Sequence, residues 1–404
     1  MRLTRGFSCV IIVIMNTKFN NVFTAEAHTL ADILHTGGVN MRLVGGAVRD
    51  TLLGLTPKDL DFAVDQPPER ITEILEAAGI KVIPTGLQHG TVTAVIKGEP
   101  FELTTLRIDV DTDGRHAEVE WTSDFEQDAG RRDFTINAMS IDRRGNLFDY
   151  FDGQADLKNG LVKFIGCADR RIQEDYLRIL RFFRFHQKLN SHTIDCESVL
   201  AMSRNVEGLK KISGERIWME MSKILIGGNL TDTVELMDEV GLFEIIGLPG
   251  FRISVNERAR TELTINPITV LAIGCKTRDD ASAVSDTINN WWKVPAEDRD
   301  LFSFLVAKGF HMQQYNATYN IGKLKELAVQ PKANVGFVTE LSVFINAELF
   351  HLFFGWEVPT FPVRGQDLIE SGMPPGPGIG IALSSMLEQW IKSDFKLTKE
   401  DLLN

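Results

Sequence analysis

The amino-acid sequence predicts an α+β fold, and two kinds of segment in its first third predict it. Apolar stretches at 41–44 and 60–64, and a longer alternating stretch at 90–110, have the period of β-strands. Residues 67–79 place apolar side chains at helical spacing instead. The chain has 404 residues, 44% of them hydrophobic and 24% charged. At roughly 150 residues per domain, this length suffices for two or more packed units.

The first predicted element is a strand, a tight turn and a helix over residues 41–53. Residues 41–44 form the strand, Gly45 and Gly46 form the turn, and the helix follows. The free N–H groups at the start of such a helix favour an anion, and Arg49 in the first helical turn would lie close to it. Two glycines that stand alone before a helix predict only a turn.

A pair of aspartates accompanies the next predicted strand, 60–64. Asp59 and Asp61 share one face of this strand, because successive side chains point to opposite sides. Neighbouring carboxylates repel each other, so the arrangement persists most readily where a divalent cation, usually magnesium beside a phosphate, neutralises them. An Asp-x-Asp pair alone is usually a solvated strand end. Together with the glycine turn, however, it predicts a site for a nucleoside triphosphate and a metal ion.

Helical and strand patterns continue after the aspartates. Residues 67–79 predict a surface helix with two prolines at its start and a glycine at its end. Residues 89–110 predict an antiparallel hairpin that turns at 97–100. Glu102, in the second strand of this hairpin, becomes a third acid of the site if its strand neighbours that of the aspartates; an exposed strand glutamate is the simpler interpretation. Residues 109–121 predict a polar loop that is long enough to move.

Charge and cysteine content exclude several classes of protein. The net charge of −12 argues against nonspecific nucleic-acid binding by the whole surface, since phosphate affinity comes from clustered Lys and Arg. Residues 163–188 are a local exception, with seven Lys or Arg against three acids, and form a candidate basic wall. The four cysteines include no CxxC pair, which argues against a zinc ribbon and a disulfide framework.

The first 25 residues differ in composition from the rest. They carry three basic residues, and no acid precedes Glu26. The apolar run at 9–15 is too short to cross a bilayer, which takes about 20 apolar residues, so no membrane association is expected. Two interpretations remain open. One is a mitochondrial targeting leader; the other is a disordered leader with Met15 as a second start, which gives a shorter product in the cytoplasm or nucleus.

Seven motifs follow one another along residues 43–225, and an eighth lies near the C-terminus. They are LVGGAVRD (43–50), KDLDF (58–62), HGTVTAVI (89–96), RRDFTINAM (131–139), DYFDG (149–153), EDYLRILRFFRF (174–185), ISGERIWMEMSKIL (212–225) and FPVRGQDLIESGMPPGPGIGIAL (361–383). As a set, they resemble the class II CCA-adding enzymes, tRNA nucleotidyltransferases that build the 3′-terminal CCA of tRNA, of the eukaryotic or mitochondrial kind. The last motif is matched only loosely.

This resemblance implies a fold and a division of the chain. A head with a nucleotidyltransferase sheet of the polymerase beta-like kind is followed by a helical neck, body and tail. In this sequence, the head would take residues 26–165, after a leader at 1–25. The neck, which selects the nucleotide, would take 166–228, the body 229–345, and the tail, which binds tRNA, 346–404.

The resemblance also implies roles for individual residues. Asp59, Asp61 and Glu102 would be the catalytic acids and would hold two Mg²⁺ ions. The substrates would be CTP, ATP and tRNA, with pyrophosphate as the product and no covalent enzyme intermediate; no oligomeric state is implied. The nucleotide-binding residues would be Gly45, Gly46, Arg49, Arg132, Asp133, Asn137, Asp175, Arg178, Arg181 and Arg184.

Hydrogen bonds explain how two of these residues could select C and A without a nucleic-acid template. Asp175 and Arg178 are three residues apart on a predicted helix and are therefore neighbours. Asp offers only acceptors and Arg only donors, which match the amino group and the ring acceptor of cytosine or adenine. Guanine and uracil present a carbonyl oxygen instead of the amino group, and such a mismatch can discriminate by about 10⁴. If only the residue types are considered, a salt bridge within the helix between Asp175 and Arg178 is the simpler interpretation. The surrounding motifs favour nucleotide selection instead.

Three alternatives to complete CCA addition stay open to different degrees. A poly(A) polymerase of the same superfamily is disfavoured, because bacterial members carry a basic stretch where this chain has LQHGTVTAV. Partial enzymes that add only CC or only A are disfavoured by the loop at 109–121, which resembles the loop that CC-adding members lack. A catalytically dead tRNA-binding protein has no need of three acids near RNA phosphate. The phenylalanines at 182, 183 and 185 are expected in the core.

Overall fold

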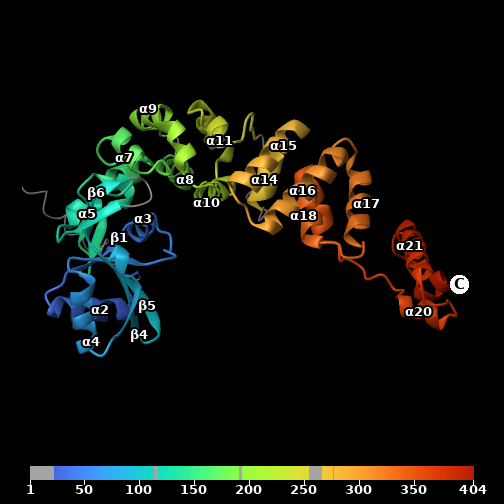
Figure 1. The fold of residues 1–404 in the computed structure, drawn as a ribbon, viewed down its shortest axis with the longest axis horizontal. Coiled ribbons are helices and arrows are strands. Elements are labelled where there is room, and N and C mark those ends of the chain that lie inside the picture. The colour runs from blue at the N-terminus through green and yellow to red at the C-terminus, as the bar shows by residue number, and fades with distance from the viewer. Residues whose placement is uncertain (1–21, 113–116, 191–192, 254–265, 276) are drawn as a thin grey trace, which may run out of the picture. The chain divides into compact units, whose positions relative to one another are not determined.

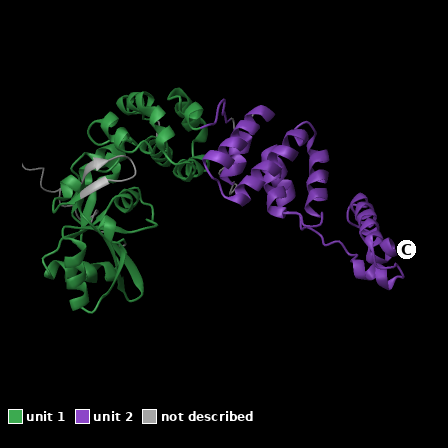
Figure 2. Cartoon of the chain, viewed as in Figure 1, with its two compact units in different colours: residues 1–246 green, residues 247–404 purple. Residues whose placement is uncertain are grey.

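The computed structural model describes residues 22–112, 117–190, 193–253, 266–275 and 277–404 (Figure 1). The predicted leader therefore lies outside the described residues, apart from its last four positions. The chain divides into two compact units, residues 1–246 and 247–404, coloured separately in Figure 2. Each unit is described by itself below. The finer division into head, neck, body and tail stays a prediction.

A mixed sheet forms the first part of unit 1. Its strand order is β3-β4-β5-β2-β1-β8-β9, in which β2 and β5 run parallel and the other neighbours antiparallel. Helices α2 and α4 pack against each other and against strands of this sheet (Figure 1). The strands are β1 (Met41–Val44), β2 (Asp61–Val64), β3 (Lys81–Gly86), β4 (Thr91–Ile96), β5 (Glu99–Thr105), β8 (Ser140–Asp142) and β9 (Leu147–Phe148).

The central strands β1 and β2 bury apolar side chains in the core. Leu43 of β1 and Phe62 of β2 are opposite each other in the register and are both fully buried. In β2, Asp61 is exposed, whereas the next three residues are buried. The predicted strands, the helix at 67–79 and the hairpin turning at 97–100 are confirmed. The helices of this part are α2 (Ala25–Thr36), α3 (Gly46–Leu52), α4 (Pro68–Ala77), α5 (Phe125–Gly130) and α6 (Gly153–Lys158), with the 3₁₀ helices η1 (Leu87–His89) and η2 (Thr135–Asn137).

The prediction of a polar loop over residues 109–121 is wrong for most of that segment. Strands β6 (Arg107–Thr112) and β7 (Ala117–Trp121) pair as an antiparallel two-stranded sheet, in which Arg107 faces Trp121 and Ile108 faces Glu120. Apolar and polar residues alternate in both strands, which is the strand period that the abundance of charged residues obscures. Residues 113–116 lie outside the described part of the chain.

The rest of unit 1 is helical, as predicted, but one predicted helix is broken. Asp175 and Arg178 were expected on one helix, but α7 ends at Glu174 and α8 begins at Arg178. Asp175 between them is extended, with φ −154° and ψ 102°, and its carboxylate accepts a hydrogen bond from the backbone N–H of Leu177 at 3.1 Å. Aspartate competes for backbone donors in this way at turns. The elements are α7 (Ala168–Glu174), α8 (Arg178–Lys188), α9 (Cys196–Asn205), η3 (Val206–Lys211), α10 (Gly214–Leu225), α11 (Leu230–Glu239) and α12 (Leu242–Ile245).

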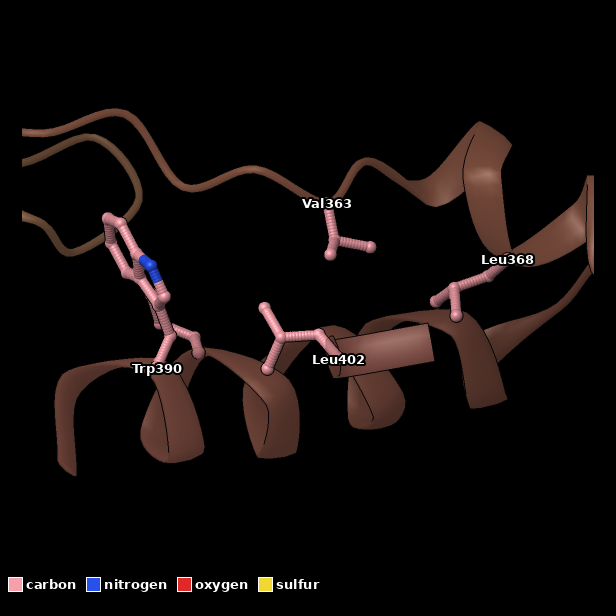
Figure 3. Close-up of a cluster of buried hydrophobic side chains, with 5 residues drawn as sticks. Val363, Leu368, Trp390 and Leu402 are labelled. Carbon is pink, nitrogen blue, oxygen red and sulfur yellow. The ribbon is translucent and has the colours of Figure 1, made fainter. Parts of the chain in front are cut away.

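Unit 2 consists of helices in its described part. Towards the C-terminus, the side chains of Val363, Leu368, Trp390 and Leu402 face one another in a small apolar core (Figure 3). No helix in the described part of either unit is long and apolar enough to cross a membrane. The elements are α14 (Pro267–Ile273), α15 (Arg278–Asp286), η4 (Thr287–Trp291), α16 (Ala296–Met312), α17 (Ala317–Ala328), α18 (Val335–Ile345), α19 (Ala347–Phe354), α20 (Gly365–Glu370), α21 (Pro377–Lys392) and α22 (Lys399–Leu403).

Candidate active site

A cavity of about 520 Å³ in unit 1 gathers residues from the sheet and from the helices that follow it. Seven arginines and four acids line it, so the lining is basic although the whole chain is acidic. Eleven predicted site residues are among the lining residues; Asp59 and Glu102 are not. The lining residues are Gly45, Gly46, Arg49, Asp61, Arg131, Arg132, Asp133, Asn137, Asp175, Leu177, Arg178, Arg181, Arg184, Phe185, Arg216, Met219 and Glu220.

The turn between β1 and α3 gives the cavity its glycine edge. Gly45 has φ 69° and ψ −128°, a conformation that side chains with a Cβ rarely adopt, and a Cβ there would lie 2.6 Å from Nη1 of Arg132. Gly46 has no such backbone strain, and a Cβ there would meet Nη2 of Arg49 at an ordinary 3.6 Å. The fold therefore requires glycine at position 45 but not at 46.

We expect Gly45→Ala to lower the free energy of unfolding by about 1–3 kcal/mol, because alanine is forced into a strained backbone conformation. It should also push Arg132 away from the cavity. Gly46→Ala is the matched control and should leave stability nearly unchanged, since alanine is favoured within a helix. Urea denaturation of both variants measures the difference. Equal stability of the two variants would contradict the assignment.

The three predicted carboxylates lie on or next to the paired strands β2 and β5. In the parallel register of β2 and β5, Asp61 lies opposite Glu102, as expected if their strands are neighbours. Asp59 precedes β2 rather than lying within it, so its expected place on one strand face with Asp61 does not hold. Desolvation raises the pKa of Asp61, the positive charge of Arg132 lowers it, and the negative charge of Asp59 raises it further; the net shift is upward. The two aspartates are thus close enough to repel each other.

This donor set fits magnesium with substrate oxygens completing the coordination shell. Within the described residues, no group of three or more His, Cys, Asp or Glu side chains is arranged to enclose a metal ion. Magnesium does not need such a cage, because it keeps several waters and binds through one or two carboxylates together with substrate phosphates. Asp59 and Asp61 are the candidates for these carboxylates, and Glu102 lies opposite Asp61 in the register of β2 and β5.

Arg49 and Asp133 belong to one buried network across the cavity wall. Arg49 donates to Oδ1 of Asn137 at 2.5 Å and pairs with Asp50 at 2.7 Å. Asn137 in turn donates to Asp133 at 2.9 Å, and Arg181 donates to Asp133 through Nε at 2.8 Å and Nη2 at 2.5 Å. Burial acts to raise the pKa of Asp133, but Arg181 and the hydrogen bonds outweigh it and lower the pKa. This network holds α8 against the sheet domain.

Asp175 and Arg178 both line the cavity, but they are not partners in a helix. Oδ2 of Asp175 accepts a hydrogen bond from Nη2 of Arg216 at 2.8 Å. Nη1 of Arg178 donates to Glu174 at 2.6 Å and to the carbonyl of Arg171 at 2.8 Å, and Nη2 donates to the carbonyl of Arg131 at 3.2 Å. The intrahelical Asp175–Arg178 salt bridge considered from the sequence is therefore wrong.

Three charged lining residues were not predicted from the sequence although their motifs were recognised. Arg216 and Glu220 lie on α10, and Glu220 pairs with Nε of Arg184 at 2.5 Å. Burial lowers the pKa of Arg184, with repulsion from Arg181 in the same direction and Glu220 opposing. Arg131 pairs with Asp128 at 2.8 Å. The available signal was Glu220 itself, a charged residue on the otherwise apolar face of an amphipathic helix.

The three phenylalanines of α8 are buried, which confirms their expected place in the core. Phe185 has a second role, because its ring forms part of the cavity lining. Three guanidinium groups lie over this ring: Arg49 at 4.6 Å, Arg181 at 5.5 Å and Arg184 at 4.3 Å from its centroid. The ring orients cations of the site through its π face.

Comparison with known proteins agrees with this geometry. Residues 41–163 match the Poly A polymerase head domain family, and residues 193–252 match the family described as probable RNA and SrmB-binding site of polymerase A. The mouse protein called CCA tRNA nucleotidyltransferase 1, mitochondrial, is 39% identical over 97% of this chain and 92% of its own length. The chain belongs to the CCA tRNA nucleotidyltransferase family. The CCA-adding enzyme of Lactobacillus johnsonii is 32% identical over 91% of this chain and 94% of its own.

Solved structures of CCA-adding enzymes share the fold of this family member. The Bacillus stearothermophilus enzyme in complex with CTP superposes with a TM-score of 0.73 at 26% identity, covering 96% of each chain. The Thermotoga maritima enzyme, solved with tRNA_CCA, gives a TM-score of 0.68 at 20% identity and shows the fold alone. The expected nucleotidyltransferase head with a mostly helical remainder is thereby confirmed.

Proposed function

We infer that this chain adds the 3′-terminal CCA to tRNA from CTP and ATP and releases pyrophosphate. Its membership of the family over nearly its whole length supports the reaction. The observation that carries the inference is a single cavity in which Asp61 and the glycine turn of the sheet lie with Asp175 and Arg178 of the helical part. One cavity can thus contact both the triphosphate and the base of a nucleotide.

Catalysis is proposed to use divalent metal ions at the end of β2, as is general in this family, and specifically two Mg²⁺. Asp59, Asp61 and Glu102 would hold them. When bound, the ions would neutralise charge on the attacking 3′ oxygen and on the leaving pyrophosphate. The position of Asp61 at the site is fixed by the fold, because Asp61 is the first residue of strand β2 and lines the cavity.

The triphosphate is proposed to lie against Gly45, Gly46 and Arg132. Arg132 has one weak partner in the described part of the chain, Asp128 at 3.4 Å, and so keeps donors for phosphate oxygens. Arg49 is already committed to Asp50 and Asn137. We therefore assign Arg132 to direct contact, with a bidentate fork suited to phosphate, and Arg49 to holding the turn. Asp133 and Asn137 position Arg181 and Arg49 through their hydrogen bonds.

Base selection is proposed to use the hydrogen-bonding groups that the protein leaves unused. Three of the five N–H groups of Arg178 donate to Glu174, Arg171 and Arg131, which leaves two for a ring acceptor. Each carboxylate oxygen of Asp175 accepts one protein hydrogen bond and keeps further acceptor capacity for an amino group. Arg184 and Arg181 add positive charge to the same wall.

One assay separates this function from its alternatives. Purified protein is incubated with magnesium and labelled nucleotides, CTP first and then ATP, on tRNA that ends at its discriminator base and, separately, on tRNA that already ends in CC. Two additions from CTP followed by one from ATP support CCA addition. A long A tail indicates a poly(A) polymerase, additions from one nucleotide only indicate a partial enzyme, and tRNA binding without any addition indicates a dead protein.

Mitochondrial localisation is proposed from the names of the relatives in mouse, human and zebrafish, with a shorter product from Met15 in the cytoplasm or nucleus. Residues 1–25 fused to a fluorescent reporter should direct it to mitochondria, because the segment is basic and contains no acid. Residues 26–50 fused in the same way serve as the control. Diffuse signal from the first fusion, seen by microscopy with a mitochondrial dye, would refute targeting. A protein beginning at Met15 should keep full activity.

A further inference from the structure

Three aromatic rings of unit 2 stack in a row on the surface. His311 and Tyr315 have ring centroids 5.1 Å apart with an interplanar angle of 28°, and Tyr315 and Tyr319 are 4.3 Å apart at 26°. Tyr315 is 43% exposed and Tyr319 is 40% exposed. His311, Tyr315 and Tyr319 lie outside every motif recognised in the sequence.

The stack is not required to fill the core of this unit. The rings lie where α16 ends at Met312 and α17 begins at Ala317. The inward side of these helices is already occupied by Met312, Leu324 and Asn320, which are all buried. In this row the ring of Tyr315 lies between those of His311 and Tyr319, so flat faces are open to a ligand at the two ends of the row.

Positive charge surrounds the rings. A cavity of about 370 Å³ has His311 and Tyr319 in its lining together with three cations, Arg278, Lys308 and Lys323, and one acid, Glu326. Residues 301–325 contain three lysines and no acid, in a chain with a net charge of −12. Lys323 pairs with Glu326 at 2.6 Å. Arg278 and Lys308 have no ion pair within the described part of the chain and are exposed.

We propose that His311, Tyr315, Tyr319, Lys308 and Arg278, here called the aromatic platform, bind unpaired nucleotides of the tRNA substrate. A base stacks on an end of the row, at Tyr319 or His311, and the two cations contact phosphates. Exposed aromatic side chains beside free Lys and Arg are the combination that single-stranded and looped RNA uses, because every base has a π face and every phosphate is negative. The proposal rests on the inferred action on tRNA but adds a contact in unit 2, apart from the cavity where chemistry takes place.

The double variant Tyr315→Ala/Tyr319→Ala tests the platform. Binding of fluorescently labelled tRNA that lacks its CCA, measured by anisotropy, should weaken roughly 5- to 100-fold, as expected for one lost base stack. KM for tRNA should rise, while kcat at saturating tRNA stays within about twofold, because unit 1 is untouched. Tyr315→Phe/Tyr319→Phe keeps both rings and should bind like wild type. Val335→Ala, at a 39% exposed apolar residue of α18 in the same unit, is the matched control and should also bind normally.

Two further measurements test the platform: the salt dependence of tRNA binding and ultraviolet crosslinking to tRNA. Lys308→Gln should reduce the salt dependence of binding by about one unit in the slope of log K against log salt, as for one lost phosphate contact. Ultraviolet irradiation of the wild-type complex should crosslink tRNA to Tyr315 or Tyr319, as read by mass spectrometry. This readout does not depend on the folding of any variant.

Two outcomes would overturn the platform. One is unchanged tRNA affinity in the alanine double variant with a native melting temperature, and the other is a wild-type complex without crosslinks to either tyrosine, which would leave the platform to a protein partner. Failure of the proposed function has a different signature, because wild-type protein would then add no nucleotides in the assay above.

Discussion

Asp61→Ala should abolish the incorporation of both CMP and AMP into tRNA. Asp59→Ala should do the same, since both residues are assigned to one metal site that serves every addition. We expect a fall in kcat of roughly 10³-fold or more, because several kcal/mol of charge stabilisation in the transition state is lost. Affinity for tRNA should persist, since arginines rather than these acids supply the positive charge of the cavity. Single-nucleotide incorporation with CTP and ATP, beside tRNA binding by anisotropy, measures both properties.

Stability provides the control for this variant. The pKa of Asp61 is raised in the folded protein, so its ionised form is disfavoured there relative to the unfolded chain. At pH values above that raised pKa, the charge of Asp61 therefore lowers the free energy of unfolding. Asp61→Asn removes the charge at nearly the same size and should therefore leave the melting temperature at pH 7 unchanged or higher while activity is lost. Loss of C addition with retained A addition would contradict a shared site, and a lowered melting temperature would contradict the charge argument.

Much of the sheet domain was predictable because local patterns there agree with tertiary packing. Glycines at the β1–α3 turn, proline at the start of α4 and the glycine turn of the β4–β5 hairpin each fix a local conformation that the fold keeps. Glu102 could only be placed conditionally, since pairing between β2 and β5 joins segments separated in sequence. No local pattern encodes that register.

The sequence predicts that the rest of unit 1 is helical, but it does not predict where the helices end or which partners the charged side chains have. The end of α7 at Glu174 depends on the carboxylate of Asp175, whose partners Leu177 and Arg216 cannot be found from helical periodicity. The role of the arginines also depended on partners distant in sequence: Arg181 is bound by Asp133, and Arg184 by Glu220. With Lys188, which pairs with Asp50, three of the seven basic residues of the expected wall are thus paired with acids outside residues 163–188.

The last prediction concerns the choice of nucleotide. Asp175→Asn should raise the incorporation of UMP relative to CMP by about 5- to 100-fold, on tRNA that ends at its discriminator base. In wild type, the carbonyl of uracil faces a carboxylate that only accepts hydrogen bonds, and such an unpaired contact costs about 1–3 kcal/mol. The amide of Asn offers a donor to that carbonyl. Metal binding should survive, because Asp59 and Asp61 lie in the sheet domain.

The structure adds a second variant that acts through the same carboxylate. Arg216 holds Oδ2 of Asp175 at 2.8 Å and is a positioning residue in this assignment. Arg216→Gln should shift the ratio of UMP to CMP in the same direction as Asp175→Asn, but less, since the carboxylate stays and only its orientation is freed. Arg216→Lys keeps the charge and should restore part of the discrimination.

Asp169→Asn is the matched control for both variants. Asp169 lies on α7, pairs with Arg204 at 2.5 Å and is not part of the cavity lining, so the same chemical change there should leave nucleotide choice unaltered. The decisive quantity is the ratio of kcat/KM for UTP to that for CTP at saturating magnesium. A uniform fall for all four nucleotides with an unchanged ratio would show that Asp175 only braces the turn between α7 and α8. Base selection would then have to be assigned to Arg178 and its remaining donors.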